Sequence, residues 1–179
     1  MWLKLELVQH TGSFKPRGMF NRVLSHEVPP AGLTVASGGN AGLAVAYVGR
    51  QLGHQVEVFV PESTPRLKAD RLRDYGAHVT MIGRDYADAL AASEKRAAES
   101  GALFVHAYDQ PEVVAGQGTL ARELADEVPH ADTVLVSVGG GGLIGGIAAW
   151  YDGTVRVVGV EPTGCPTLHA AIAAGFVSF

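Results

Sequence analysis

The hydrophobic pattern of this chain alternates between short apolar runs and longer amphipathic stretches. Runs rich in Val, Ile and Leu, such as Val134–Val138, are continuous, which is typical of strands buried on both faces of a sheet. The apolar runs predict strands at about 2–7, 33–37, 56–60, 78–82, 102–106, 133–138 and 155–161. The stretches between them predict helices at about 16–25, 40–52, 65–75, 85–100, 110–127, 142–151 and 167–174.

This regular alternation of strand and helix predicts an α/β fold built on a mostly parallel sheet. In open sheets of this kind, ligands bind at the carboxyl ends of the strands. The turns that lead from a strand into a helix are therefore the first places to look for function.

Composition excludes several classes of protein. The 179 residues are 47% hydrophobic and 18% charged, which is enough apolar material for a folded core. A net charge of −4 offers no basic surface for nucleic acid, and no apolar run is long enough to span a membrane. The start of the chain does not resemble a signal peptide. The single cysteine, Cys165, excludes a disulfide framework and a cysteine-built metal site. We expect a soluble, cytoplasmic protein.

Four consecutive glycines, Gly139–Gly142, follow the predicted strand at 133–138 and open a helix. Each glycine costs roughly 0.5–1 kcal/mol relative to alanine, and a tight bend needs only one or two. Backbone amides without Cβ atoms at the start of a helix form a cradle for anions. The run therefore predicts a phosphate-binding loop.

A second turn, Ser37–Gly42, follows the predicted strand at 33–37. Asn40 is suited to be the N-cap of the next helix. The two preceding glycines instead favour a ligand that approaches the backbone. The residues alone leave both interpretations open.

A third turn carries Lys15, which directly precedes Pro16 at a predicted helix start. A cation at the positive end of a helix dipole is unfavourable by roughly 0.3–1 kcal/mol when exposed. Next to Phe14, the neutral and nucleophilic form of the amine would be favoured. Most lysines are nevertheless solvated, and the residues alone favour that interpretation. Together, an amine, an Asn and a phosphate cradle fit pyridoxal phosphate held as a Schiff base.

Five segments resemble motifs of the fold-type II pyridoxal-phosphate enzymes. Thr11–Gly18 is similar to their Schiff-base lysine motif, and Ser37–Gly42 is similar to their asparagine loop. Ala115–Thr119 resembles a helix segment of the threonine and serine dehydratases. Gly139–Leu143 resembles the phosphate loop, and Val158–Pro162 the strand end after it. The order and rough spacing agree over essentially the whole chain, and the resemblance reverses the interpretation of Lys15 as a surface residue.

The resemblance implies a role for each turn. Lys15 would hold the cofactor and take the Cα proton of the substrate. Asn40 would bind the ring hydroxyl of the cofactor, and the glycine amides its phosphate. The implied cofactor contacts are Phe14, Lys15, Asn40, Gly139, Gly140, Gly141, Gly142 and Leu143. The implied substrate contacts, for the carboxylate, are Ser37, Gly38, Gly39, Asn40 and Ala41.

The implied activity is elimination of ammonia from L-threonine or L-serine to give a 2-oxo acid. The resemblance also implies a three-layer αβα fold, with a large domain from 1–31 plus 111–179, a small inserted domain at 32–110, and a homodimer or higher oligomer. Gly38 stands where related racemases carry a Ser, so racemase activity is not expected. Cys165 and Thr167 stand where some relatives complete a cation site beyond Glu161, so no metal is expected.

The relatives have a segment before the first strand and further strands after the last helix. One of those strands supplies the group that meets the pyridine nitrogen. Since this chain ends at 176–179, the resemblance implies truncation at both ends.

Three alternatives stay open. Cysteine synthases and threonine synthases, which catalyse related β-replacement chemistry, share much of the scaffold. Gly140–Gly145 is formally G-x-G-x-x-G, and Glu161 lies 21 residues after Gly140, as in a dinucleotide-binding oxidoreductase. That interpretation leaves the turns at Lys15 and Asn40 unexplained. The third alternative is a non-catalytic fragment that keeps only the phosphate site.

Overall fold

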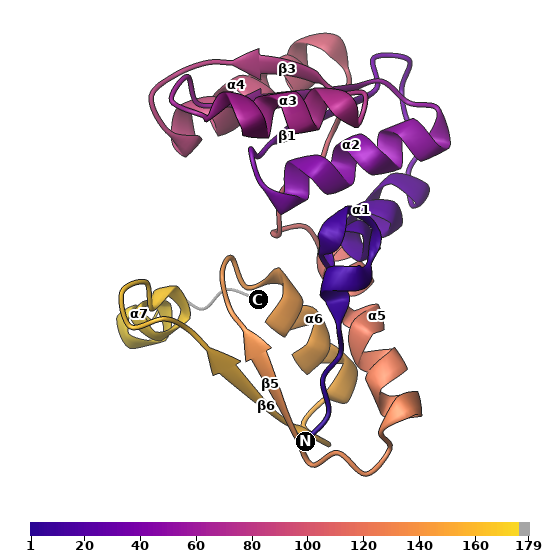
Figure 1. Ribbon diagram of the computed structural model, residues 1–179, viewed down its shortest axis with the longest axis vertical. Helices are drawn as coiled ribbons and strands as arrows, with labels where there is room; N and C mark the ends of the chain where they lie inside the picture. The colour runs from indigo at the N-terminus through magenta and orange to yellow at the C-terminus, as the bar shows by residue number, and fades with distance from the viewer. Residues whose placement is uncertain (176–179) are drawn as a thin grey trace.

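The computed structural model describes residues 1–175 and contains two parallel sheets (Figure 1). The larger sheet has the strand order β3-β2-β1-β4 and consists of β1 (Leu33–Ala36), β2 (Val56–Val60), β3 (His78–Met81) and β4 (Leu103–Phe104). The smaller sheet pairs β5 (Thr133–Ser137) with β6 (Arg156–Val160). Because all of these pairings are parallel and the sheets carry helices, the predicted α/β class is confirmed.

Within the described residues, seven α-helices precede, connect and follow the strands, and each begins and ends within about one residue of its predicted position. They are α1 (Lys15–Leu24), α2 (Asn40–Leu52), α3 (Arg66–Asp74), α4 (Tyr86–Ser100), α5 (Pro111–Glu127), α6 (Gly142–Tyr151) and α7 (Thr167–Ala174). Two short 3-10 turns, Glu6–Val8 and His10–Gly12, precede α1. Among the described residues, no helix is both long and apolar enough to cross a membrane.

The four-stranded sheet is the middle of three layers. Leu33 and Val35 of β1 belong to the main core, together with the buried residues of α2. The alternate residue Ala36 packs with Phe59 and Ala89 of α4 in a separate cluster. Successive residues of a strand face opposite sides of the sheet, so this split places α2 and α4 on its two faces.

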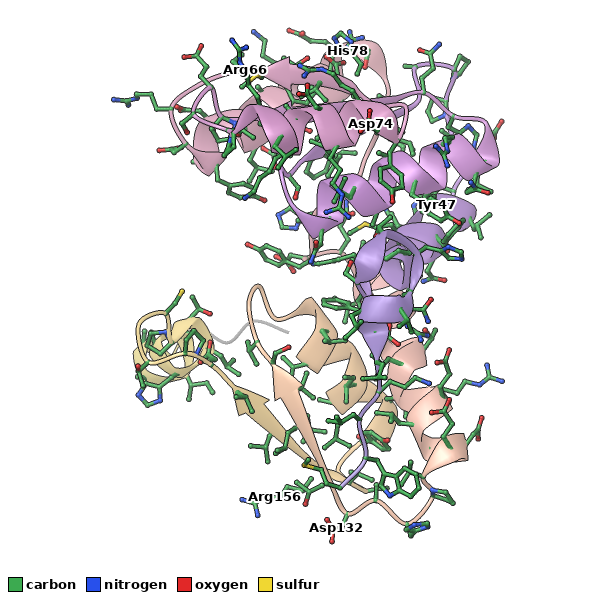
Figure 2. The ribbon with its side chains drawn as sticks, viewed as in Figure 1. Tyr47, Arg66, Asp74, His78, Asp132 and Arg156 are labelled. Carbon is green, nitrogen blue, oxygen red and sulfur yellow. The ribbon has the colours of Figure 1, made fainter. Side chains whose placement is uncertain are left out.

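Helix α1 lies between the larger sheet with its helices and the part of the chain that contains α5, α6 and the smaller sheet (Figure 1). On one side, Tyr47 of α2 lies beside α1 (Figure 2), stacked on His10 at 4.8 Å between ring centroids and edge-on to Phe20. The division at about 32 and 110 into two domains stays a prediction, and the separation of the two sheets supports it.

Helix α5 packs on α1 and α6 through glycines. A Cβ on Gly116 would lie 2.6 Å from the Arg17 carbonyl oxygen and 2.6 Å from the Cα of Gly18. A Cβ on Gly118 would lie 2.7 Å from the carbonyl oxygen of Gly146 in α6. Real Cβ atoms do not approach backbone this closely. The Ala115–Thr119 segment therefore has glycines because two helices touch its backbone.

The predicted strand at 2–7 is wrong. Within it, Glu6 already belongs to the first 3-10 turn, and no other strand pairs with the segment among the described residues. Its alternating pattern has another cause, because the charged residues turn inward. Lys4 Nζ contacts Glu127 at 2.6 Å, and Glu6 contacts Arg17 at 2.8 Å. The apolar residues on either side of Lys4 face outward: Leu3 is 74% exposed and Leu5 52% exposed.

Substitution of Gly118 tests the close packing of α5. We expect Gly118→Ala to lower the free energy of unfolding by about 1–3 kcal/mol, because the new methyl group forces α5 and α6 apart. Gly145→Ala is the matched control: it lies in α6, where a Cβ would make an ordinary 3.7 Å contact with Val114. It should stabilise by about 0.5–1 kcal/mol through helix propensity. Urea unfolding measures both, and equal effects would refute the packing argument.

Candidate active site

A cavity of about 290 Å³ lies where the start of α1 meets the turn between β5 and α6. It is lined by Phe14 and Lys15, by Tyr108, and by residues 137–144. Of the predicted site residues, it brings together the lysine motif and the whole glycine loop with Leu143. The two motifs are more than a hundred residues apart in the sequence, and the fold joins them in one cavity.

The turn before α1 adopts an unusual backbone conformation. Thr11 has φ 62° and Gly12 has φ 76°, both in the left-handed region. Thr11 is not glycine, so this conformation is strained, and it is buried with its hydroxyl unpaired among the described residues. The turn delivers Ser13 in an extended conformation and Phe14 directly before the helix. Lys15 therefore enters the cavity at the first position of α1.

The Lys15 amine is held away from water. Its Nζ donates a hydrogen bond of 2.6 Å to the Ala107 carbonyl oxygen and lies 5.2 Å from the centre of the Phe14 ring. Burial lowers the pKa of Lys15 to about 8. At pH 7 about a tenth of such an amine is neutral, against about 0.03% at the usual pKa. Lys15 is therefore not the solvated lysine that the residues alone favoured, and its role as a nucleophile stays a prediction.

Three of the four glycines of the loop are required, each for a different reason. A Cβ on Gly140 would overlap the Tyr108 ring, and one on Gly142 would lie 2.6 Å from the Tyr108 carbonyl oxygen. Gly141 has φ 88°, which disfavours any side chain. A Cβ on Gly139 would meet nothing within 4 Å. Gly139 is therefore the one position of the four at which nothing in the described chain requires glycine.

The residues around the cavity fit pyridoxal phosphate. Helix α6 begins at Gly142 with Gly141 as its N-cap, and the first amides of a helix have no partners inside it. These amides and the positive end of the helix suit a phosphate. On another wall, the Lys15 amine suits an aldehyde. The rings of Phe14 and Tyr108 offer apolar surface for an aromatic ring.

The asparagine loop does not line this cavity. Gly39, not Asn40, is the N-cap of α2, and no side-chain capping bond is made there. The N-cap interpretation of Asn40 is therefore wrong. Asn40 is exposed at the first position of the helix, and the Ser37 hydroxyl oxygen accepts a bond from the Gly39 amide. The roles predicted for Ser37, Gly38, Gly39, Asn40 and Ala41 stay predictions.

Tyr108 is the cavity residue outside the predicted turns that the sequence analysis missed; Ser137, Val138 and Ile144 flank the predicted glycine loop. It lies in the connection between β4 and α5, at residues 105–110. A usable signal existed, because this connection also follows a strand end. It contains no glycine run and no charged nucleophile, so nothing in its composition drew attention to it.

Glu161 caps a helix. Its carboxylate accepts bonds from the amides of Leu168 at 2.7 Å and His169 at 3.0 Å, and from the Thr167 hydroxyl at 2.9 Å. These bonds to the start of α7 hold the pKa of Glu161 below its usual range. Within residues 1–175, no group of three or more His, Cys, Asp or Glu side chains could hold a metal ion. The chain end at 176–179 lies outside the described residues.

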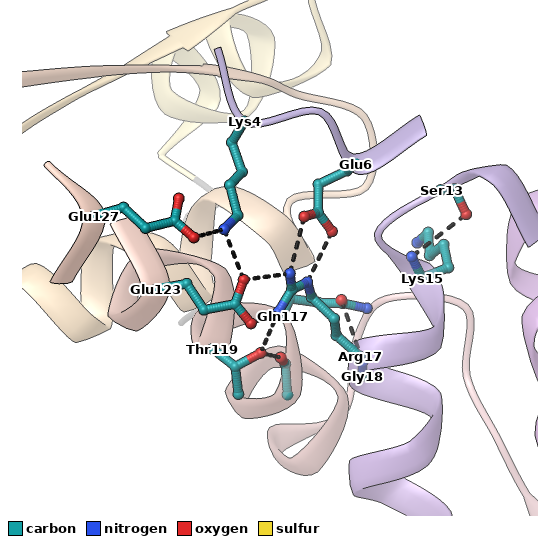
Figure 3. A network of polar contacts seen from close by, with 11 residues as sticks. Lys4, Glu6, Ser13, Lys15, Arg17, Gly18, Gln117, Thr119, Glu123 and Glu127 are labelled. Carbon is teal, nitrogen blue, oxygen red and sulfur yellow. Dashed lines mark hydrogen bonds and ion pairs between the residues drawn. The ribbon is translucent and has the colours of Figure 1, made fainter. Parts of the chain in front are cut away.

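An ion-pair network secures the helix that carries Lys15 (Figure 3). Arg17, two residues later, pairs with Glu6 at 2.8 Å and with Glu123 of α5 at 2.6 Å. Lys4 pairs with Glu123 at 2.8 Å. The hydrogen bond from Arg17 lowers the pKa of Glu123 to about 2. The network ties the start of α1 to α5 and to the N-terminal segment.

Comparison with known proteins identifies relatives over nearly the whole chain. A family model described as pyridoxal-phosphate dependent enzyme matches residues 1–178. The chain is 43% identical to an L-threonine ammonia-lyase of Geobacter sulfurreducens over 98% of its own length and 45% of that protein.

Solved structures agree with this match. A threonine deaminase isoform from Solanum lycopersicum superposes with a TM-score of 0.89 at 30% identity, covering 96% of this chain and 49% of that one. A serine racemase from maize gives 0.91 at 30% identity, covering 98% and 55%. The chain spans less than half the length of the curated relatives that it matches.

The pH dependence of stability tests the network. Glu123 has a lower pKa in the folded chain, about 2, than its ordinary value of 4.5. Its stabilising contribution is therefore complete above about pH 4.5 and is lost as the pH falls toward 2. We expect Glu123→Gln to reduce the fall in unfolding free energy across this range. The exposed Glu62→Gln is the control, and an identical pH profile for both variants would contradict the assignment.

Two glycine substitutions separate ligand binding from folding. We expect Gly139→Ala to change the free energy of unfolding by less than about 0.5 kcal/mol, because its Cβ meets open space. The same variant should bind pyridoxal phosphate about tenfold more weakly. Gly142→Ala should destabilise by about 1–3 kcal/mol, because its Cβ meets backbone. Undiminished cofactor binding by Gly139→Ala would show that Gly139 is not part of a phosphate cradle.

Proposed function

The chain belongs to the family of pyridoxal-phosphate dependent enzymes, and from this we propose that it eliminates ammonia from L-threonine or L-serine, using Lys15 as its catalytic amine. The observation that carries the proposal is a single cavity with the Lys15 amine on one wall and the glycine loop on another. A phosphorylated aldehyde needs both groups, at opposite ends.

Each wall of the cavity has a task in this proposal. The amides at Gly139–Gly142 bind and orient the phosphate, and the Phe14 ring supplies apolar contact for the cofactor ring. The cofactor, when bound, supplies an electron sink that stabilises negative charge at the substrate Cα. Phe14 and Tyr108 keep water from the amine, which favours its neutral form.

Lys15 is the group that moves the proton. Its pKa of about 8 lets the amine take a proton from the substrate Cα near neutral pH and return to the neutral state afterwards. In the described conformation, its Nζ donates to the Ala107 carbonyl. After the amine has taken the proton, the Ala107 carbonyl oxygen can accept a hydrogen bond from the resulting ammonium group.

The substrate end of the proposal rests on the second loop. Asn40 has no capping role at the start of α2, so its side-chain amide is available for the cofactor hydroxyl. The backbone of Ser37–Ala41 would receive the substrate carboxylate. The relatives named L-threonine ammonia-lyase support a small β-hydroxy amino acid as substrate. A homo-oligomer in the cytoplasm remains part of the proposal, as a prediction from the family resemblance.

The dinucleotide alternative loses its support in this arrangement. That interpretation uses Glu161 to bind a ribose, yet the Glu161 carboxylate accepts three bonds from the start of α7. It also assigns no task to the buried Lys15 amine. The β-replacement alternative keeps the same Lys15 and glycine loop, and the choice between the two reactions depends on the substrate that is turned over.

Cofactor titration with lysine variants tests the proposal. We expect the full chain to give a saturable absorption change with pyridoxal phosphate, and borohydride to fix the label on Lys15. Lys15→Ala should lose the covalent label and lower 2-oxo acid formation from L-threonine by at least about 10³-fold, because the nucleophile and base are one group. Lys68→Ala, at an exposed lysine, is the control. A Lys15→Ala variant that is labelled and active like the parent chain would overturn the assignment.

A further inference from the structure

We propose that Tyr108 is the positioning residue of this site: its ring fixes the glycine loop, and its turn closes the Lys15 amine off from water. The inference deepens the proposed function, on which it rests only for the catalytic role of that amine. Its geometric basis lies in three sets of contacts, which concern the turn itself, the glycine loop and the amine.

The turn that carries Tyr108 is internally fixed. The His106 Nδ1 accepts hydrogen bonds from the amides of Tyr108, at 3.3 Å, and Asp109, at 2.9 Å. The His106 amide donates to Gln110 Oε1 at 2.9 Å. The His106 ring also meets the Tyr108 ring edge to face, with centroids 4.7 Å apart. An accepting Nδ1 carries no proton, which agrees with the way burial lowers the pKa of His106.

The Tyr108 ring and the glycine loop fit together as a pair. The ring occupies the space that a side chain on Gly140 would take, and the Tyr108 backbone crowds the Cβ position of Gly142. Interiors this tightly packed have few alternative arrangements. Removal of the ring would therefore let the backbone at Gly140 move, and the amides that follow Gly140 would no longer be held in one conformation.

The same turn covers the amine. The Ala107 carbonyl, one residue before Tyr108, accepts the hydrogen bond from Lys15 Nζ, and the Tyr108 ring centre lies 6.0 Å from that nitrogen. Two neighbouring residues, Ala107 and Tyr108, thus contact the Lys15 amine and the glycine loop. Removal of the Tyr108 ring should therefore change both the pKa of the Lys15 amine and the packing of the glycine loop.

The charges around the amine do not account for its lowered pKa. The turn carries the titratable groups His106, Tyr108 and Asp109, and α4 carries Tyr86 and Glu94. Of these, His106 is the group whose pKa responds to the charge on Lys15, and that pKa is lowered chiefly by burial. Burial is the cause that lowers the pKa of Lys15. The lowered pKa of Lys15 should therefore depend on how far the Tyr108 ring shields the amine from water, and removal of the ring hydroxyl alone should leave that pKa unchanged.

The first test measures the Lys15 amine without any cofactor. The full chain is acetylated with acetic anhydride over a pH series, and the Lys15 peptide is quantified by mass spectrometry. In the parent chain and in Tyr108→Phe, the Lys15 amine should titrate with a pKa of about 8. Tyr108→Ala, with the amine opened to water, should titrate at least about one pH unit higher. A folded Tyr108→Ala with an unchanged midpoint would overturn the proposal.

The second test is a double-mutant cycle of unfolding in urea. Gly140→Ala should destabilise the parent chain, because its methyl group meets the ring, and should destabilise Tyr108→Ala much less. Equal effects in both backgrounds would overturn the pairing of ring and loop. Neither test uses pyridoxal phosphate, so failure of the proposed function, seen as a parent chain that binds no cofactor, is distinguishable from failure of this inference.

Discussion

The close contact of α5 with two other helices is the constraint on which the site depends. Gly116 lets α5 touch the backbone of α1 near Arg17, and Gly118 lets it touch the backbone of α6 at Gly146. Lys15 stands at the start of α1, and the glycine loop opens α6. A methyl group at either glycine would push one helix outward. The distance between the Lys15 amine and the glycine loop therefore depends on Gly116 and Gly118 having no side chain.

Two further sets of contacts, the Arg17 ion pairs and the turn at 105–110, hold Lys15 in the site that this helix packing forms. The Arg17 network ties the start of α1, which carries Lys15, to α5 and to the N-terminal segment. The turn at 105–110 closes the remaining side and supplies the oxygen that holds the amine. Burial there lowers the pKa of Lys15 to about 8, and the turn before it holds Thr11 in the strained left-handed region.

The sequence predicted the elements that bury a continuous apolar run or stripe, and it erred where a tertiary contact decides the outcome. Residues 2–7 alternate like a strand, but their charged positions satisfy ion pairs with α1 and α5. The glycine loop was assigned wholly to phosphate, whereas Tyr108 accounts for Gly140 and Gly142. That contact joins residues about thirty positions apart, and no local pattern reports it. Lys15 was singled out only through the family resemblance, because its place in the cavity is also a tertiary property.

The most direct test of the account is a crystal structure of this chain grown with pyridoxal phosphate. The account predicts the phosphate on the amides of Gly139–Gly142, and density that continues from the cofactor to the Nζ atom of Lys15, with the bond to the Ala107 carbonyl released. A phosphate bound away from the glycine loop, or a cofactor in the cavity with Lys15 still on Ala107, would contradict it.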